Sequence, residues 1–188
     1  MDNISYYFEK YLSDKSVNGY SEIYDEVFHS RRNESIKLLE IGIGTLNNTE
    51  SNMLFWKDKY YDYLPGASLR AFRDYFPNGQ IYGIDIQPDC LINDDRIRTY
   101  LFNSTVKSLC DAFLFDKTFD FIIDDGDHHS DAQIKTFENL FPRLNSGGVY
   151  IIEDLAFPDD IRKYFTNSNY THSFRNPPYG LVLIFKPE

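Results

Sequence analysis

The sequence contains little cysteine, with Cys90 and Cys110 as the two cysteines among 188 residues. Their spacing matches no metal or redox motif, which excludes a disulfide framework and a thiolate zinc site and predicts two buried free thiols. No apolar run approaches the roughly 20 residues of a membrane-spanning helix. Residues 1–12 carry three charged side chains where a secretory signal would be apolar. We therefore expect a cytoplasmic protein without a membrane partner.

Basic residues are also scarce. The chain has 19 Lys and Arg against 29 Asp and Glu, which gives a formal net charge of −10. An acidic protein is poorly suited to a phosphate backbone, so nucleic acid is excluded as the main partner. Aromatic residues are abundant at 17%, and such large side chains can build a sizeable core from a short chain. The length predicts a single domain over residues 1–188.

Apolar residues form short strand-like runs that alternate with helical stripes along most of the chain. Strands separated by helices predict parallel crossovers. We therefore predict an α/β fold, a Rossmann-like, doubly wound and mostly parallel sheet of seven strands. Helices cover both faces, and the last two strands form an antiparallel hairpin at the C-terminal edge. The predicted strands are residues 36–43, 80–86, 97–102, 119–123, 149–152, 170–174 and 181–185. The predicted helices are residues 4–12, 23–28, 65–76, 106–115, 130–144 and 159–165.

Two segments lie outside this alternation. Residues 1–34 form an N-terminal helical segment. Residues 45–64 are polar and aromatic without a clear period, and they stand where a strand normally passes directly into a helix. We predict that residues 45–64 are an inserted loop or lid. Substrate selectivity is expected to come from these two segments.

The first and second predicted strands end in residues suited to a nucleoside cofactor. Glu40 precedes the turn glycines Gly42 and Gly44, and Asp85 ends the next strand. Ligands of open parallel sheets bind beyond the carboxyl ends of the strands. The third glycine of a dinucleotide fingerprint is missing, which disfavours NAD and FAD and favours S-adenosylmethionine. Ordinary turn glycines and a helix-capping aspartate are the alternative.

Acidic residues follow two further strands of the predicted sheet. Asp125 follows one strand, and Glu153 and Asp154 follow the next. Neighbouring strands lie about 4.8 Å apart, so these carboxylates are expected to converge. Hard oxygen ligands of this kind suit Mg²⁺, with Mn²⁺ and Ca²⁺ as alternatives. Solvated loop acids are the competing interpretation.

A histidine stands beside this acidic group. His128 follows Asp125 by three residues in a turn that contains a glycine. A neutral imidazole there can accept a proton from a hydroxyl group whose acidity a metal has raised. Asp127 and His129 are competing candidates for the base. A histidine before a helix can also be an ordinary cap or surface residue.

Taken together, residues 38–44, 66–70, 82–86, 119–128 and 150–155 resemble class I S-adenosylmethionine-dependent methyltransferases. They are most similar to the metal-dependent macrolide-sugar O-methyltransferases of the mycinamicin type. In that pattern an Ile-Asp-Asp-Gly-x-His turn is paired with Ile-Glu-Asp, as at residues 123–128 and 152–154 here. Those enzymes carry an additional N-terminal domain that this sequence does not include.

The resemblance implies roles for individual residues. It implies that the metal ligands are Asp125, Glu153 and Asp154 and that the catalytic base is His128. It places cofactor contacts on Glu40, Gly42, Gly44, Ser68, Asp85 and Asn103, the last on the adenine side.

We therefore predict an S-adenosylmethionine-dependent O-methyltransferase. It would move a methyl group to a hydroxyl of a sugar or glycosylated small molecule, assisted by Mg²⁺ or another divalent cation and a histidine base. The sequence leaves open the acceptor molecule and whether the chain forms a homo-oligomer. One alternative is a non-catalytic nucleoside-binding or scaffold domain with a structural cation. Another is a nicotinamide-dependent oxidoreductase, which the missing glycine disfavours.

Overall fold

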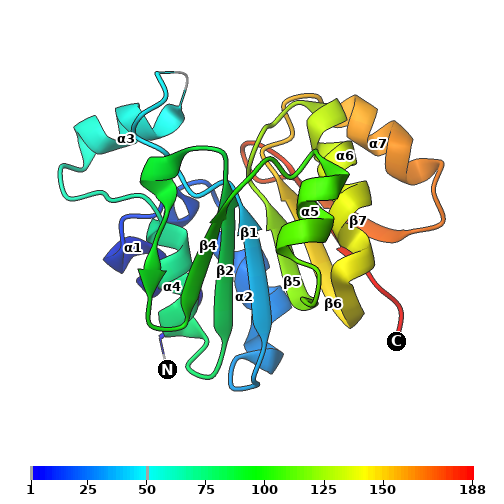
Figure 1. Cartoon of the computed structure of the whole chain (residues 1–188), viewed down its shortest axis with the longest axis horizontal. Helices are drawn as coiled ribbons and strands as arrows, with labels where there is room; N and C mark the ends of the chain where they lie inside the picture. Colours follow the sequence, from blue (N-terminus) through cyan, green and yellow to red (C-terminus); the bar gives the residue numbers. More distant parts are fainter. Residues whose placement is uncertain (1, 50) are drawn as a thin grey trace.

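The computed structural model describes residues 2–49 and 51–188, and its strands form one sheet (Figure 1). Among these residues the sheet has eight strands in the order β3-β4-β2-β1-β5-β6-β8-β7. The strands are β1 (Lys37–Ile41), β2 (Gln80–Asp85), β3 (Asn93–Asp94), β4 (Ile97–Leu101), β5 (Phe119–Asp124), β6 (Leu144–Glu153), β7 (Thr171–Arg175) and β8 (Leu181–Phe185).

The sheet is mostly parallel, as predicted. β4, β2, β1, β5 and β6 run parallel to one another, and β8 pairs antiparallel with both β6 and β7. This arrangement confirms the doubly wound α/β prediction and the C-terminal hairpin. The predicted number of seven strands is wrong because β3 adds an eighth, which pairs antiparallel with β4. A strand of two residues is too short to leave an alternating pattern in the sequence.

Helices cover both faces of the sheet. The α-helices are α1 (Ile4–Lys10), α2 (Ser21–Phe28), α3 (Asn52–Lys59), α4 (Ala67–Tyr75), α5 (Lys107–Phe113), α6 (Ser130–Leu140) and α7 (Pro158–Thr166). The 3₁₀ turns are η1 (Asp14–Ser16), η2 (His29–Arg31), η3 (Pro88–Cys90) and η4 (Phe141–Arg143). No helix among the described residues is both long and apolar enough to cross a membrane.

Each face of the sheet has its own core. Side chains of α1, α2 and α4 pack on one face, and those of α5, α6 and α7 pack on the other. Figure 1 shows these two groups of helices on opposite sides of the strands. In β1, Leu38 joins the first core and Leu39 the second. Alternate residues of a buried strand thus point to opposite covered faces, which is why the strand is apolar throughout.

Aromatic residues line both cores, and in the first core they join the N-terminal helices to the sheet. Phe28 of α2 packs against Phe72 of α4 and Phe121 of β5, with ring centroids 6.0 and 4.7 Å apart. Phe8 of α1 meets Phe72 edge to face. These contacts fasten the N-terminal helical segment onto the sheet. Cys90 and Cys110 are both buried and free, as predicted.

The segment predicted to be an inserted loop or lid contains α3. Figure 1 shows α3 at the edge of the molecule, near the N-terminal segment. The Trp56 indole donates a hydrogen bond to the Leu12 carbonyl over 2.7 Å, and the buried Tyr63 hydroxyl donates to the Gly44 carbonyl over 3.2 Å. Phe55 of α3 remains 75% exposed. Because α3 lacks a continuous apolar stripe, its sequence does not show helical periodicity.

The connection between α6 and β6 also differs from the prediction. The helix predicted over residues 130–144 ends at Leu140 and continues as η4. β6 already begins at Leu144, five residues before the predicted start of the strand. Its pairing with β5 shifts register between Phe119 and Phe121. Polar and glycine residues at 145–148 are therefore part of an irregular strand, although their composition is typical of a loop.

Candidate active site

The candidate site lies at the carboxyl ends of β1, β5 and β6. Ile41 of β1 pairs with Asp124 of β5, and Asp124 pairs with Ile152 of β6. The residues that come next in the chain are Gly42 after Ile41, Asp125 after Asp124 and Glu153 after Ile152. These three residues therefore lie side by side at the edge of the sheet. Parallel pairing thus explains why residues far apart in sequence meet here.

Asp154 leaves the sheet through an unusual backbone conformation. Its φ angle is +49°, in the left-handed region that residues other than glycine rarely adopt. Such conformations cost about 1–3 kcal/mol and tend to occur at functional sites. The Tyr20 hydroxyl donates a hydrogen bond to Asp154 Oδ1, which fixes the carboxylate. The other oxygen, Oδ2, is directed toward His128.

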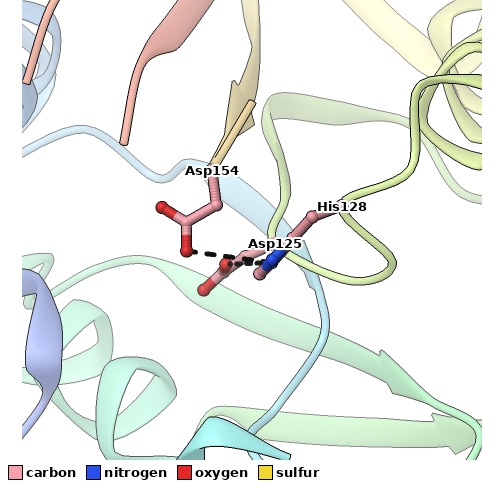
Figure 2. Close-up of side chains that lie close together, drawn as sticks. All are labelled: Asp125, His128 and Asp154. Carbon is pink, nitrogen blue, oxygen red and sulfur yellow. Dashed lines mark ion pairs between the residues drawn. The ribbon is translucent and has the colours of Figure 1, made fainter. Parts of the chain in front are cut away.

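Three predicted site residues converge at this edge (Figure 2). His128 Nε2 lies 3.5 Å from Asp125 Oδ1 and 3.8 Å from Asp154 Oδ2. One ligand atom from each residue falls within 4.8 Å of the others, and all three side chains are partly exposed. A cation and an acceptor can therefore reach them from solvent.

The carboxylates control the basicity of the histidine. Burial lowers the pKa of the His128 imidazole, but Asp125 and Asp154 outweigh this effect and raise the pKa above its usual value. Burial and the charge of Asp125 raise the pKa of Asp154. A positive charge among these three side chains is therefore stabilised.

The competing candidates for the base lie elsewhere. His129 Nδ1 is 2.7 Å from Asp127 Oδ1, and both side chains are largely exposed. His129 also packs against Phe157, with ring centroids 5.6 Å apart. The pair forms a small surface cluster of its own. Of the three candidates, His128 is the one that faces the strand-end carboxylates.

Lys15 of η1 also reaches this site, and sequence reasoning missed it. Its Nζ lies 2.7 Å from Asp125 Oδ2, 2.7 Å from Glu153 Oε2 and 3.4 Å from Glu40 Oε1, and its side chain is only 2% exposed. Burial lowers the pKa of Lys15, but the surrounding carboxylates raise it well above its usual value. No sequence signal marks Lys15, because a lysine in a polar turn is normally solvated.

Glu153, predicted to be a metal ligand, has both carboxylate oxygens engaged. The Tyr24 hydroxyl donates to Oε1, and the Lys15 ammonium donates to Oε2. Burial raises the pKa of Glu153 to about 7, although Lys15 opposes the shift. Glu153 is thus held by the N-terminal segment, whereas Asp125 and Asp154 each direct one oxygen toward His128.

The predicted cofactor residues Glu40 and Ser68 contact each other. The Ser68 hydroxyl donates to Glu40 Oε2 over 2.6 Å. Glu40 Oε1 is buried without a hydrogen-bond partner, 3.4 Å from the Lys15 ammonium. Burial raises the pKa of Glu40 to about 7. Glu40 Oε1 thus has an ion pair but no hydrogen bond, which fits a cofactor that brings a donor to this position.

Asp85 and the turn glycines organise the loop after β1. The Ile43 amide donates to Asp85 Oδ2 over 2.8 Å, and the Gln87 amide donates to Oδ1 over 2.9 Å. Gly42 and Gly44 have φ angles of +85° and +90°. A Cβ atom at Gly42 would overlap the Asp125 carbonyl, and one at Gly44 would meet the Tyr63 hydroxyl. Local packing therefore requires both glycines, whether or not a cofactor is bound.

Asn103 lies apart from these contacts. It follows β4 and is exposed, and its Oδ1 accepts hydrogen bonds from the Thr105 amide and hydroxyl over 2.9 and 2.8 Å. This is a local turn. The structure therefore brings Glu40 and Ser68 into contact, and it joins Glu40 to the acidic residues through Lys15. The local turn accounts for the contacts of Asn103 Oδ1 without a ligand.

The donor set fits a divalent cation. The carboxylate oxygens of Asp125 and Asp154 are ligands that Mg²⁺ and Mn²⁺ accept, with further positions left for water or an acceptor. The surrounding charge is acidic, and a cation would relieve the repulsion between Asp125 and Asp154. The fit rests on the convergence of these two carboxylates at one edge of the sheet, with the His128 imidazole beside them.

Comparisons with known proteins find O-methyltransferases among the relatives of this chain. The chain is 37% identical over 139 residues to mycinamicin VI 2''-O-methyltransferase of Micromonospora griseorubida, covering 70% of this chain and 30% of the relative. It is 31% identical over 165 residues to 8-demethyl-8-alpha-L-rhamnosyl tetracenomycin-C 2'-O-methyltransferase of Streptomyces olivaceus, covering 80% and 39%. The chain thus spans about a third of the length of these curated relatives. No family model matches it.

A solved structure extends the likeness to the whole chain. The MycE methyltransferase from the mycinamycin biosynthetic pathway, in complex with Mg, SAH and mycinamycin VI, has a TM-score of 0.78 at 24% identity. The match covers 100% of this chain and 55% of that chain. The chain therefore has the fold of the class I S-adenosylmethionine-dependent methyltransferases. In sequence it is similar to part of the two O-methyltransferases described above.

Proposed function

We propose that this chain catalyses S-adenosylmethionine-dependent methylation of a hydroxyl group on a sugar or glycosylated small molecule, assisted by Mg²⁺ or another divalent cation. The observation that carries the proposal is the convergence of Asp125, His128 and Asp154 beside the turn that follows β1. The sequence relatives support the same reaction class, since their names describe O-methylation in macrolide and tetracenomycin chemistry.

The residues around the site have distinct roles in this proposal. Asp125 and Asp154 would hold the cation, with Glu153 as the third predicted ligand. When bound, the cation supplies Lewis acidity that lowers the pKa of the acceptor hydroxyl. His128 Nε2 would accept the hydroxyl proton, while the bound cofactor would supply the methyl group to the hydroxyl oxygen and leave as the thioether. The flanking carboxylates then stabilise the protonated imidazole, in keeping with its raised pKa.

The cofactor would lie along the turn after β1 and the end of β2. The predicted contacts are Glu40, Gly42, Gly44, Ser68, Asp85 and Asn103. Asp85 already accepts two backbone hydrogen bonds, but a carboxylate has about four lone-pair positions and can accept more. In this position the methyl group would face the edge at which Asp125 and His128 stand.

The acceptor would bind between the strand ends, the N-terminal segment and the insert at residues 45–64. Phe55 and Tyr61 are exposed on this insert, and exposed aromatic rings can stack on a sugar.

The net charge of −10 supports a small-molecule acceptor over nucleic acid. The buried free thiols support a reducing compartment such as the cytoplasm. A homo-oligomer remains compatible with this function.

The decisive experiment is a methyl-transfer assay with a glycosylated macrolide acceptor. Excess chelator should abolish transfer, and added Mg²⁺ should restore it. His128→Ala should lower kcat by about 10²–10⁴-fold, the usual contribution of a general base. His129→Ala is the matched control, because His129 pairs with Asp127 at the surface and should leave the rate near wild type. Transfer that persists in chelator and in His128→Ala would exclude both assignments.

A thermal-shift measurement separates this function from a non-catalytic scaffold domain. S-adenosylhomocysteine should raise the melting temperature of the chain, because a ligand that binds the folded state stabilises it. Mg²⁺ should add a further increase. A scaffold whose acidic residues bind only a structural cation would respond to Mg²⁺ and not to the nucleoside.

A further inference from the structure

The Lys15 ammonium belongs to neither the predicted cation ligands nor the predicted cofactor contacts, yet it touches both groups. It donates to Asp125 Oδ2 and Glu153 Oε2 and lies 3.4 Å from Glu40 Oε1. Asp125 and Glu153 belong to the predicted cation site, and Glu40 belongs to the predicted cofactor site. One buried positive charge therefore joins the two halves of the active site.

The backbone around Lys15 fixes its position. The Ser13 amide donates to the Phe8 carbonyl over 2.8 Å, and the Ser16 hydroxyl donates to the Ser13 carbonyl over 2.9 Å. Leu12 adopts a left-handed φ of +59°, and its carbonyl accepts the Trp56 indole hydrogen bond. The turn is held from both sides, so the lysine enters the acidic edge from a defined direction.

The ammonium occupies oxygens that a divalent cation would otherwise use. Lys15 takes one oxygen of Asp125 and one of Glu153, and Tyr24 takes the other oxygen of Glu153. The oxygens directed toward His128 are Asp125 Oδ1 and Asp154 Oδ2. Three carboxylates, those of Glu40, Asp125 and Glu153, pair with one ammonium, so a divalent cation can join the cluster without creating a net positive charge.

We propose that Lys15 is a built-in counter-cation that competes with the divalent metal for Asp125 and Glu153 and thereby sets the metal affinity of the active site. Lys15 is a positioning residue, since it acts through these carboxylates and not on the substrate. The proposal rests on the proposed function for the presence of a metal. It predicts weaker and more easily reversed metal binding than three free carboxylates would give.

The first test measures Mn²⁺ binding by electron paramagnetic resonance, with full-length chain and no cofactor or acceptor. Lys15→Met keeps the length of the side chain and removes its charge. This variant should bind Mn²⁺ about tenfold or more tightly than wild type, because it removes the repulsion between the ammonium and the dication and frees the carboxylate oxygens that Lys15 occupies. Lys15→Arg should retain wild-type affinity. Lys10→Met is the control, because Lys10 pairs with Asp74 away from the site.

A double variant assigns part of the gain to Glu153. In Lys15→Met with Glu153→Gln, the increase in affinity relative to Glu153→Gln alone should be smaller than in the wild-type background, because only the Asp125 oxygen is then released. Equal Mn²⁺ affinity in wild type and Lys15→Met would overturn the proposal and leave the proposed function standing. Absence of Mn²⁺ binding in both would overturn metal assistance and this proposal together.

A measurement on the wild-type chain tests the proposal if the Lys15→Met variant does not fold. The Lys15 ammonium signal can be followed in protein labelled with ¹⁵N-lysine, with Lys15→Arg used to assign it. Titration with Mg²⁺ should shift this signal with the same midpoint as metal binding. A signal that stays fixed while Mg²⁺ binds would contradict competition between the two cations.

Discussion

The N-terminal segment docks on the sheet through two ionic clusters of similar chemistry and different burial. The outer cluster consists of Lys10, Tyr11, Arg73 and Asp74, and the inner cluster consists of Lys15, Tyr24, Asp125 and Glu153. In both, a lysine and a tyrosine donate to a carboxylate. The Lys10 side chain is 43% exposed, whereas the Lys15 side chain is 2% exposed.

The carboxylate pKa shifts in opposite directions at Asp74 in the outer cluster and at Glu153 in the inner cluster. In the outer cluster, burial raises the pKa of Asp74, but hydrogen bonds from Lys10, Tyr11 and Arg73 lower it to about 2. In the inner cluster, burial raises the pKa of Glu153 to about 7 in spite of Lys15. The same donors therefore stabilise an anion at the surface and only partly offset the desolvation of Glu153 in the interior. At Asp125, burial also raises the pKa, but Lys15 and His128 outweigh it and lower the pKa. Buried groups whose pKa values are shifted in this way are typical of functional sites.

The largest expected effect comes from removing the two lysines in turn. In the presence of chelator, Lys15→Met should lower the free energy of unfolding by about 3–5 kcal/mol, because it leaves buried carboxylates without their partner. Lys10→Met should cost at most about 1 kcal/mol, as for other exposed ion pairs. Urea denaturation followed by circular dichroism measures both changes.

Added Mg²⁺ sharpens this comparison. It should recover part of the Lys15→Met loss and leave Lys10→Met unchanged, because a cation can replace only the inner ammonium. Equal losses for the two variants would show that burial does not distinguish the clusters.

The two tyrosine hydroxyls are expected to differ less than the two lysines in their contribution to the free energy of unfolding. Tyr24→Phe removes the donor to Glu153 Oε1 and should cost about 1–3 kcal/mol, because it leaves a buried acceptor unsatisfied. Tyr11→Phe removes a donor to Asp74, which keeps Lys10 and Arg73, and should cost less than about 1 kcal/mol. Chemical denaturation of the two variants under one buffer condition measures the difference. A larger loss in Tyr11→Phe would reverse the ranking of the clusters.

Some elements of the fold can be predicted from local sequence patterns, and others cannot. Strands and helices of the sheet follow from local periodicity, and the parallel order then places Asp125 and Asp154 at one edge with His128. α3 and β3 escape prediction because one lacks an apolar stripe and the other has two residues. Local pattern thus predicts the parallel strands and the acidic residues that follow them, but not the short edge strand β3 or the irregular start of β6.

Lys15 could not be predicted for a different reason. Its partners Asp125 and Glu153 lie 110 and 138 positions away, and the polar turn around it is typical of solvent-exposed sequence. The engagement of Glu153 by Lys15 and Tyr24 is likewise a property of tertiary packing. Motifs name the acidic residues, but only the packed N-terminal segment shows which carboxylate oxygens are already bound.

The smallest expected effect is the pH dependence of the outer cluster. The pKa of Asp74 is lowered from 3.8 to about 2 in the folded chain, so the folded state favours the ionised carboxylate. Its contribution is fully present well above pH 3.8 and is lost as the pH falls through about 2. Because Asp74 is partly exposed, we expect this contribution to be at most about 1 kcal/mol.

Asp74→Asn tests this dependence, because it keeps the shape of the side chain and removes its charge. The gap in free energy of unfolding between wild type and Asp74→Asn should be widest near pH 5 and should narrow toward pH 2, as urea denaturation at each pH would show. High salt should also narrow the gap at pH 5, since an exposed ion pair is screened. A gap that stays constant with pH and salt would mean that Asp74 acts through packing, and the electrostatic contrast between the two clusters would then fail.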